Sequence, residues 1–301
     1  MTPQLPKAVP VPDDALPFDD PPRRLFAAYP TRLTTWQDCP RRYRFTYLEP
    51  KPKAGPWAHY SVGSSVHDAL RRWFDLPVVE RTADAVAAMV ERRWIDAGFR
   101  DDSQSEQAKH RAMEWVRDYV ATQDSTIDPA GLERSVGTTT AVLSMRGRVD
   151  RIDRRLDDDG NEELVVVDYK TSRRPCTQDE ARSSLQLAMY AAATARSLRR
   201  PCTLVELHHV PSATVVSWRY REGQLQRHLA RADDLGLEAA TAEAGWRAAG
   251  GAETISSEVA DELFPPIPDA RCSWCDVRSS CAEGRAVSNE VTPWEAIARG
   301  D

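Results

Sequence analysis

The period of the hydrophobic pattern changes near Pro129, and this change constrains the fold more than any other feature of the sequence. Before Pro129 apolar residues recur at helical spacing, whereas after it they alternate or form short apolar runs. Helices are predicted over residues 31–47 (two, broken at Pro40), 61–75, 82–97, 104–120, 178–198 and 222–248, and strands over 136–143, 145–153, 164–169, 203–210 and 214–220. Strands flanked by helices predict an α/β fold.

The same pattern divides the chain into four parts. Residues 1–29 are rich in proline and have no sustained periodicity, so we expect a flexible leader. Residues 30–130 are expected to form a helical N-terminal part, and residues 131–250 the α/β core. Residues 251–301 include a stretch rich in proline and cysteine with little periodicity, so we expect something other than a hydrophobic face to order them.

Composition and charge exclude several classes of protein. Hydrophobic residues make up 41% and charged residues 29% of the 301 residues, which excludes a largely disordered or fibrous chain. No apolar run reaches about 18 residues, so we expect no membrane partner and a cytoplasmic location. The net charge is −6, yet residues 21–60 hold eight Lys and Arg residues against two acidic ones. That stretch either faces phosphates or is solvated surface.

Two carboxylates and one amine are placed to share a pocket. Asp168 and Lys170 are two residues apart in an expected strand, so both side chains point to one face, and Asp150 in the preceding strand can converge on them. Carboxylate oxygens suit Mg²⁺ or Mn²⁺, which polarise phosphate and lower the pKa of water. The alternative is a surface Asp-x-Lys pair on an edge strand. The apolar run 164–167 favours function, because an unneeded charge pair is costly to bury there.

Side chains on the neighbouring helices extend this set. Gln186 and Tyr190 are four residues apart in the helix expected after the Asp168 strand, with Arg182 one turn earlier on the same polar face. These three side chains form a platform for a phosphate or a base. Upstream, Gly63 precedes His67 by four residues beside an apolar helical stripe. By itself, the pattern favours an ordinary core histidine at His67.

The cysteines divide by spacing. Cys272, Cys275 and Cys281 form a C-x2-C-x5-C motif, and Cys39 precedes a proline near the other end of the chain. Four thiolates suit either zinc or an iron–sulfur cluster, and spacing leaves both open. Cys176 and Cys202 lack partners at ligand spacing and are expected to be ordinary small residues.

The ordered set of motifs resembles the RecB-type exonucleases of the PD-(D/E)XK nuclease superfamily, which include the CRISPR-associated adaptation exonucleases. The matching motifs are Gly63 with His67, Asp150, the Asp168-Tyr169-Lys170 tripeptide, and Gln186 with Tyr190. The resemblance covers nearly everything beyond residue 30 and implies a restriction-endonuclease-like mixed β-sheet flanked by helices. Val149 stands where the motif has its proline.

The resemblance also implies roles. His67, Asp150, Asp168 and the backbone carbonyl of Tyr169 would bind the divalent metal, Lys170 would assist the attacking water, and Gln186 and Tyr190 would contact DNA. Cys39 with the C-terminal motif looks like the 4Fe–4S staple of the iron–sulfur members of this family. Such a cluster would clasp Cys39 to a tail more than 230 residues away.

The predicted function is a Mg²⁺- or Mn²⁺-dependent DNA exonuclease acting on single-stranded ends in DNA repair or recombination. One alternative is a DNA-binding nuclease module that works only with a helicase partner. The sequence has no G-x-x-x-x-G-K-[ST] phosphate loop, so a partner would have to supply translocation. Another alternative is an exonuclease that processes spacers in CRISPR adaptation.

Overall fold

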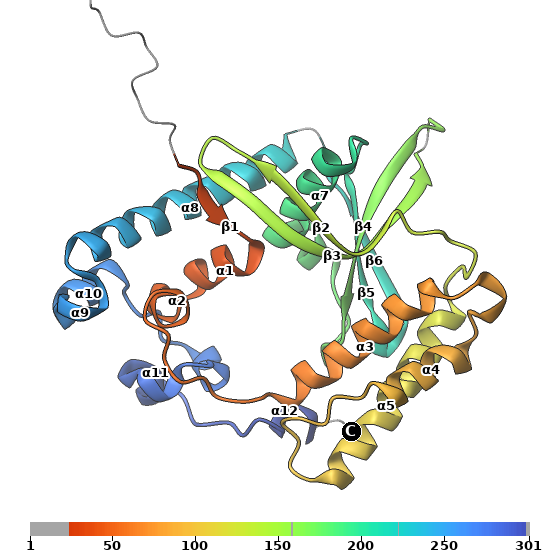
Figure 1. Ribbon diagram of the computed structural model, residues 1–301, viewed down its shortest axis with the longest axis horizontal. Helices are drawn as coiled ribbons and strands as arrows, with labels where there is room; N and C mark the ends of the chain where they lie inside the picture. Colours follow the sequence, from red (N-terminus) through yellow and green to blue (C-terminus); the bar gives the residue numbers. More distant parts are fainter. Residues whose placement is uncertain (1–23, 158, 222, 299–301) are drawn as a thin grey trace, which may run out of the picture.

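The computed structural model describes residues 24–298 apart from 158 and 222 (Figure 1). Most of the expected leader, residues 1–23, lies outside the described residues. Within the rest of it, Phe26–Ala28 (β1) is a short strand that pairs in parallel with residues 143–145. Three residues are too few to carry a periodic pattern, so this strand was not predicted.

A six-stranded mixed sheet lies at the centre of the molecule. Its other strands are β2 Gly131–Thr139, β3 Leu143–Leu156, β4 Glu162–Lys170, β5 Leu204–His209 and β6 Thr214–Arg219. β3 has 14 residues and pairs with β1 in parallel and with β2 and β4 in antiparallel fashion. β4 and β5 are parallel, and the helices between them make the crossover that such a pair requires. The α/β fold with a mixed sheet flanked by helices is confirmed.

Most helices between residues 30 and 248 follow the predicted pattern, and four short helices beyond residue 250 were not predicted. They are α1 Pro30–Asp38, α2 Pro40–Tyr47, α3 Ala58–Asp75, α4 Ala83–Arg92, α5 Asp102–Ala121, α6 Gln178–Ser183, α7 Leu185–Leu198, α8 Gln224–Ala248, α9 Gly251–Thr254, α10 Ser257–Leu263, α11 Ala282–Val287 and α12 Glu295–Ala298. Shorter 3₁₀ turns are η1 Val78–Glu80, η2 Val210–Ser212, η3 Ala270–Trp274 and η4 Arg278–Ser280. The prediction of one helix over 178–198 was wrong, because Ser184 interrupts it and caps α7 by accepting a hydrogen bond from the Leu187 N–H.

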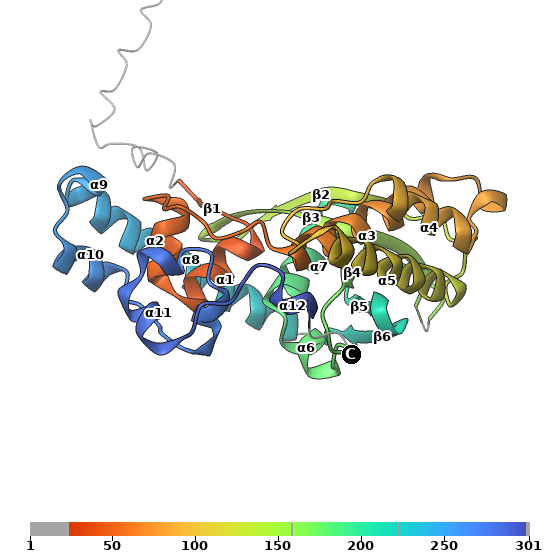
Figure 2. The ribbon, with the colours of Figure 1, turned by 90° about the horizontal axis from the view of Figure 1, so that it is seen from below.

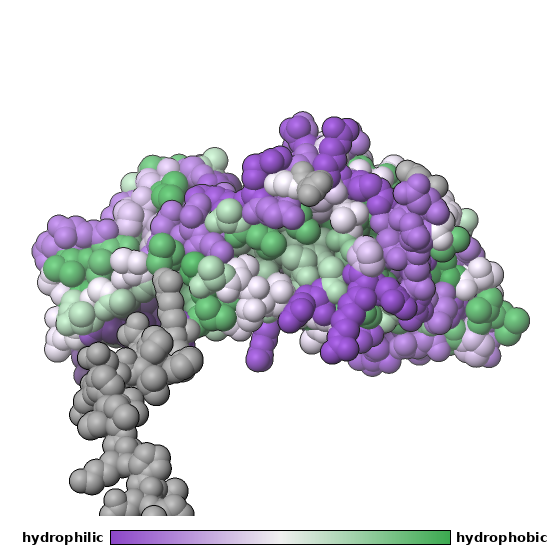
Figure 3. Space-filling model, turned by 90° about the horizontal axis from the view of Figure 1, so that it is seen from above, coloured by the Kyte–Doolittle hydropathy of each residue, from purple (hydrophilic) through white to green (hydrophobic). Residues whose placement is uncertain are grey.

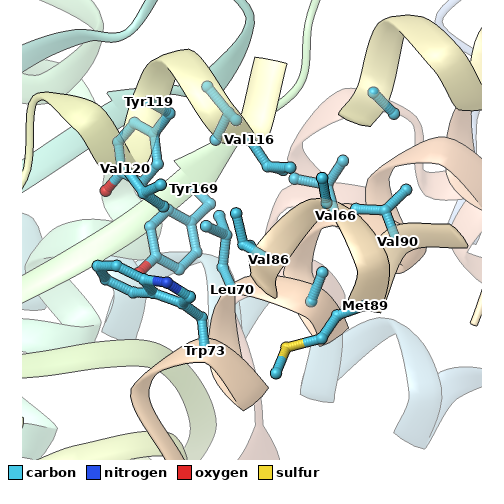
Figure 4. Packing of buried hydrophobic residues seen from close by; sticks show 14 of the residues in the cluster. Val66, Leu70, Trp73, Val86, Met89, Val90, Val116, Tyr119, Val120 and Tyr169 are labelled. Carbon is cyan, nitrogen blue, oxygen red and sulfur yellow. The ribbon is translucent and has the colours of Figure 1, made fainter. Parts of the chain in front are cut away.

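Helices cover both faces of the sheet. Val165, Val167 and Tyr169 of β4 pack against α3, α4 and α5, in the cluster that Figure 4 shows around Tyr169. Leu164 and Val166 point to the opposite face and pack against α7. Burial on both sides explains why β4 is a continuous apolar run until its polar end.

A further core holds the N-terminal helices to the rest of the chain. Leu33, Trp36 and Tyr43 of α1 and α2 pack with Leu235 of α8 and with Phe264. Figures 1 and 2 show α1, α2, α8 and α11 at one end of the molecule and α3, α4 and α5 at the other.

Three arginines of the basic stretch 21–60 form ion pairs inside the protein. Arg32 pairs with Glu243, and Arg41 pairs with Glu283 at 2.7 Å. The side chains of Arg41 and Arg44 are each only 9% exposed. These three arginines therefore tie α1 and α2 to α8 and the C-terminal segment, and the idea that they face phosphates does not hold for them.

The surface carries both hydrophilic and hydrophobic side chains. The face shown in Figure 3 is mostly hydrophilic at its projecting side chains, with hydrophobic residues between them. Among the described residues, none of the helices combines the length and the apolar character needed to cross a bilayer.

Candidate active site

A cavity of about 1630 Å³ opens beside the sheet where β3 and β4 separate. Residues of α3 and α5 line the cavity, together with the start of β2, the middle of β3 and the end of β4. Trp274 of η3 and Ile297 of α12 bring the C-terminal segment to the same cavity. The cavity therefore gathers side chains from both ends of the chain.

Three carboxylates lie in a row across adjacent strands. In the register of β2 and β3, Leu132 pairs with Arg151 and Arg134 with Val149, which puts Glu133 opposite Asp150. In the register of β3 and β4, Arg151 pairs with Val167, so Asp168 lies next to Asp150 where the pairing ends. The row therefore runs Glu133, Asp150, Asp168 across the sheet.

His67 on α3 completes a group that could hold a metal ion. Candidate ligand atoms of His67, Glu133 and Asp150 all lie within 4.8 Å of one another, and His67 Nδ1 is 3.4 Å from Asp150 Oδ2. One imidazole and two carboxylates suit a divalent cation such as Mn²⁺ or Mg²⁺. These side chains therefore fit the predicted metal chemistry, with Glu133 as a member that the sequence analysis did not name.

Glu133 was missed because the strand was expected to start at Val136. Hairpin pairing would have located it, since the pairing of Thr139 with Ser144 continues along the two strands to Glu133 and Asp150. Its backbone has φ 45°, a left-handed conformation that is uncommon for a residue with a side chain. Such strain costs of the order of 1–3 kcal/mol and is concentrated at functional sites. The conformation supports a functional role for this residue.

Asp168 lies behind the cavity wall and is held by two neighbours. Its Oδ2 is 2.5 Å from Lys170 Nζ, and the side-chain amide of Gln186 donates a hydrogen bond to its Oδ1 at 3.0 Å. The Asp168 side chain is 7% exposed, whereas that of Lys170 is 38% exposed. Lys170 therefore presents its amine to the cavity while Gln186 fixes the carboxylate orientation.

The electrostatics of this group favour a bound cation. Burial raises the pKa of Asp168, and Asp150 adds to the rise while Lys170 opposes it. Burial also raises the pKa of Glu133, and Asp150 adds to that rise. For His67, burial acts to lower the pKa, but Asp150, Asp168 and Glu133 outweigh it and raise the pKa. Burial and the neighbouring carboxylates thus both disfavour uncompensated negative charge here, and a bound cation would neutralise it.

Two glycines let side chains reach the site. A Cβ atom at Gly147 would lie 2.4 Å from Tyr190 Cε1, so only glycine leaves room for this phenol, which lines the cavity. A Cβ atom at Gly63 would lie 3.2 Å from Thr171 Oγ1, so this glycine lets α3 approach the end of β4 closely. That approach brings His67, one turn further along α3, to the carboxylates.

A buried polar network holds Tyr169 in place beside the two aspartates. Arg151 is 1% exposed, pairs with Asp153 at 3.0 Å and donates a hydrogen bond to the Tyr169 hydroxyl at 3.1 Å. The Tyr169 backbone N–H in turn donates to Asp150 Oδ2 at 2.9 Å. The network thus fixes both ends of Tyr169, whose peptide lies between the two aspartates.

Arg182 does not join this group. It lies on α6, which the break at Ser184 separates from α7, so it is not on one helical face with Gln186 and Tyr190. Arg182 pairs with Asp179 at 3.0 Å and lies over the ring of Trp218. It is not among the residues that line the cavity.

A second, smaller cavity brings the four spaced cysteines together. Cys39, Cys272, Cys275 and Cys281 line a space of about 70 Å³ between α2 and the C-terminal segment. The N–H groups of Asp269 and Gly284 donate to the sulfurs of Cys272 and Cys281 at 3.5 and 3.3 Å. Such N–H···S bonds favour the thiolate state that metal binding requires. Cys202 is buried elsewhere, and Cys176 also lies outside this cavity.

The comparisons with known proteins agree with this geometry. A family model described as the PD-(D/E)XK nuclease superfamily matches residues 29–282. The matched range includes the carboxylate row, His67 and all four of the spaced cysteines. A search of curated proteins found no match.

Proposed function

Because the chain belongs to the PD-(D/E)XK nuclease superfamily, we propose that it is a Mg²⁺- or Mn²⁺-dependent DNA exonuclease that digests single-stranded ends in DNA repair or recombination. The single observation that carries the proposal is the carboxylate row Glu133, Asp150, Asp168 with Lys170 beside it at the cavity. A structural ion pair would need neither three carboxylates in a row nor a large cavity in front of them.

The chain's own residues divide the work of hydrolysis. His67, Glu133 and Asp150 would hold the cation, with Asp168 behind them. A bound divalent cation polarises the scissile phosphate and lowers the pKa of water. Burial opposes the charged form of Lys170, but Asp168 and Asp150 outweigh it and raise the pKa of this amine. Lys170 is therefore an ammonium at neutral pH that can stabilise the negative charge developing on the phosphate.

Asp168 and Gln186 would contribute by holding Lys170 in position. Gln186 donates to one oxygen of Asp168, which leaves the other for Lys170. This arrangement fixes the amine at the cavity wall. Tyr190, which lines the cavity beside Asp150, is placed to contact the DNA strand.

A nuclease assay on end-labelled strands tests the proposal. The parent protein with Mg²⁺ or Mn²⁺ should digest the strand, and Asp168→Asn or Lys170→Met should reduce the rate by about 100-fold or more. Asp84→Asn, at a carboxylate that is 92% exposed on α4, is the control and should cleave normally. A parent protein that never cleaves DNA with either metal, whatever the strand form, would falsify the proposal.

We propose in addition that the four spaced cysteines hold a 4Fe–4S cluster. They line one cavity, with N–H donors at two of the sulfurs. Four thiolates around one cavity are a ligand set that suits such a cluster or a zinc ion. The likeness of Cys39 and the C-x2-C-x5-C motif to the iron–sulfur members of the family favours the cluster.

A further inference from the structure

The C-x2-C loop carries an aromatic side chain into the nuclease cavity. Trp274 lies between Cys272 and Cys275, and it lines the large cavity together with His59 and Tyr60. The same short loop therefore contributes thiolates to the cysteine cavity and an indole to the cavity of the carboxylate row.

These aromatic residues form one wall, which we call the aromatic wall: Trp57, His59, Tyr60 and Trp274. The ring centroids of Trp57 and Trp274 are 5.6 Å apart, those of Trp57 and His59 are 5.9 Å apart, and those of His59 and Tyr60 are 4.3 Å apart. The rings therefore touch in a continuous series.

Trp57 anchors the aromatic wall. It is 4% exposed, and its indole N–H donates to the Asp276 carboxylate at 3.0 Å. The backbone carbonyl of Asp276 accepts a further hydrogen bond from Ala54 at 2.6 Å. Trp274 stands two residues after Cys272 and two before Asp276, and both of these residues accept hydrogen bonds, so the loop is held on both sides of Trp274.

The outer members of the aromatic wall are open. Tyr60 is 56% exposed and Trp274 is 40% exposed, although both are large hydrophobic side chains that folding normally covers. Their exposed surface adjoins the cavity that they line. Arg71, Arg111 and Arg173 line the same cavity and supply positive charge for phosphates. Aromatic rings beside cationic side chains are the combination that binds single strands.

Building on the proposed nuclease function, we propose that the aromatic wall stacks unpaired bases of a single-stranded DNA end, with Trp274 as the main contact. The faces of paired bases are covered by their neighbours in a duplex, whereas those of a single strand are free to stack on a ring. The cysteine loop thereby acts as a positioning element that holds Trp274 at the cavity.

Binding measurements separate stacking from backbone contacts. An Asp168→Asn background prevents digestion, and fluorescence anisotropy with Mg²⁺ present follows three labelled probes: oligothymidylate, the same strand with abasic sites, and a blunt hairpin duplex. Trp274→Leu should weaken binding of oligothymidylate by about ten-fold. It should change binding of the abasic strand and of the hairpin far less. Trp274→Phe, which keeps a ring, should retain most of the affinity for oligothymidylate.

Trp246→Leu is the matched control, because it removes a partly buried indole on α8 that lies outside the cavity. It should leave all three affinities unchanged. Thermal melting and the visible spectrum of each variant show whether the cysteine loop is intact, and Trp274→Phe decides the outcome if Trp274→Leu disturbs that loop.

Two failures are distinguishable. If the parent cleaves and binds DNA but Trp274→Leu binds all three probes as the parent does, or loses affinity for all three equally, the stacking inference is wrong and the nuclease proposal stands. If the parent neither binds nor cleaves DNA, the nuclease proposal fails and the stacking inference fails with it.

Discussion

The backbone N–H of Tyr169 donates a hydrogen bond to the carboxylate of Asp150 at 2.9 Å. This bond bridges β3 and β4 just beyond the last pair of the ladder, Arg151 with Val167. It holds the peptide of Tyr169 against Asp150 while leaving the Tyr169 carbonyl available for another partner. The sequence resemblance implies that this carbonyl is a metal ligand, and that assignment remains a prediction.

Glu133 can be tested as a metal ligand by thermal denaturation. A cation that binds the folded state raises the melting temperature, and the rise is larger for tighter binding. Glu133→Gln removes one negative charge at constant size, so the rise on adding MnCl₂ should shrink markedly. Glu238→Gln, at a carboxylate that is 53% exposed on α8, should keep the full rise. If MnCl₂ raises the melting temperature of Glu133→Gln as much as that of the parent, Glu133 is not a metal ligand.

Gly147 should not tolerate a side chain. Alanine at this position would place its Cβ 2.4 Å from the Tyr190 ring, and the resulting strain should lower the free energy of unfolding by about 1–3 kcal/mol. Urea denaturation measures this loss. The double variant Gly147→Ala with Tyr190→Ala should lose less than the sum of the two single variants, because the clash is absent. Additive losses would show that the ring and the glycine do not interact.

Gly63→Ala can be compared with Gly147→Ala, because both add a methyl group at a glycine beside the site. Its Cβ would lie 3.2 Å from the Thr171 hydroxyl, which can shift slightly, and alanine is favoured over glycine inside a helix by about 1 kcal/mol. The two effects oppose each other, so the free energy of unfolding should change little. A loss as large as that of Gly147→Ala would mean that α3 cannot adjust at this point.

Glu206 should contribute to stability in mild acid. Burial acts to raise its pKa, but hydrogen bonds and charge from His208 and Arg155 outweigh it and lower the pKa from 4.5 to about 2. A carboxyl group whose folded-state pKa is lowered stabilises the fold above its unfolded pKa. This contribution, of the order of 3 kcal/mol, is lost as the pH falls from about 4.5 toward 2.

Urea denaturation at a series of pH values checks this window. Glu206→Gln should be less stable than the parent at neutral pH, because Arg155 loses a bidentate partner at 2.6 and 2.8 Å. The stability difference between the two proteins should narrow as the pH falls from 4.5 to 2. A difference that stays constant across this range would contradict the assignment.

Serine substitution at the cysteine cavity tests the proposed cluster. Cys39→Ser, Cys272→Ser, Cys275→Ser and Cys281→Ser should each lose bound iron and visible absorbance after anaerobic purification, and each should melt at a lower temperature. Cys176→Ser, outside the cavity, should keep the iron of the parent. A colourless parent that carries one zinc ion would leave the four-cysteine site in place and exclude the cluster.

The residues that the sequence predicted best are those fixed by short-range pattern. The apolar run before Asp168 located β4, and Pro40 located the start of α2. The short strand β1 depends on pairing with a segment more than 100 residues away, which no local pattern encodes. Glu133 lies in the part of β2 before the predicted start at Val136, and its place follows only from the register of the β2–β3 hairpin. The break at Ser184 was hidden because the apolar residues of α7 keep helical spacing beyond it. The ion pairs of Arg41 and Arg44 could not be predicted, because each involves an acidic residue more than 200 residues away along the chain. Arg41 pairs with Glu283 and Arg44 with Asp261.

Cys39 shares a cavity with three cysteines that lie more than 230 residues later in the chain, and this has a consequence for folding during synthesis. Residues 30–47 leave the ribosome long before residues 270–284 are synthesised. Helices α1 and α2 therefore emerge before the C-terminal segment that they contact. The ion pair of Arg41 with Glu283 and the cysteine cavity can form only after residues 270–284 have been synthesised. During that interval the thiol of Cys39 is left open to oxidants.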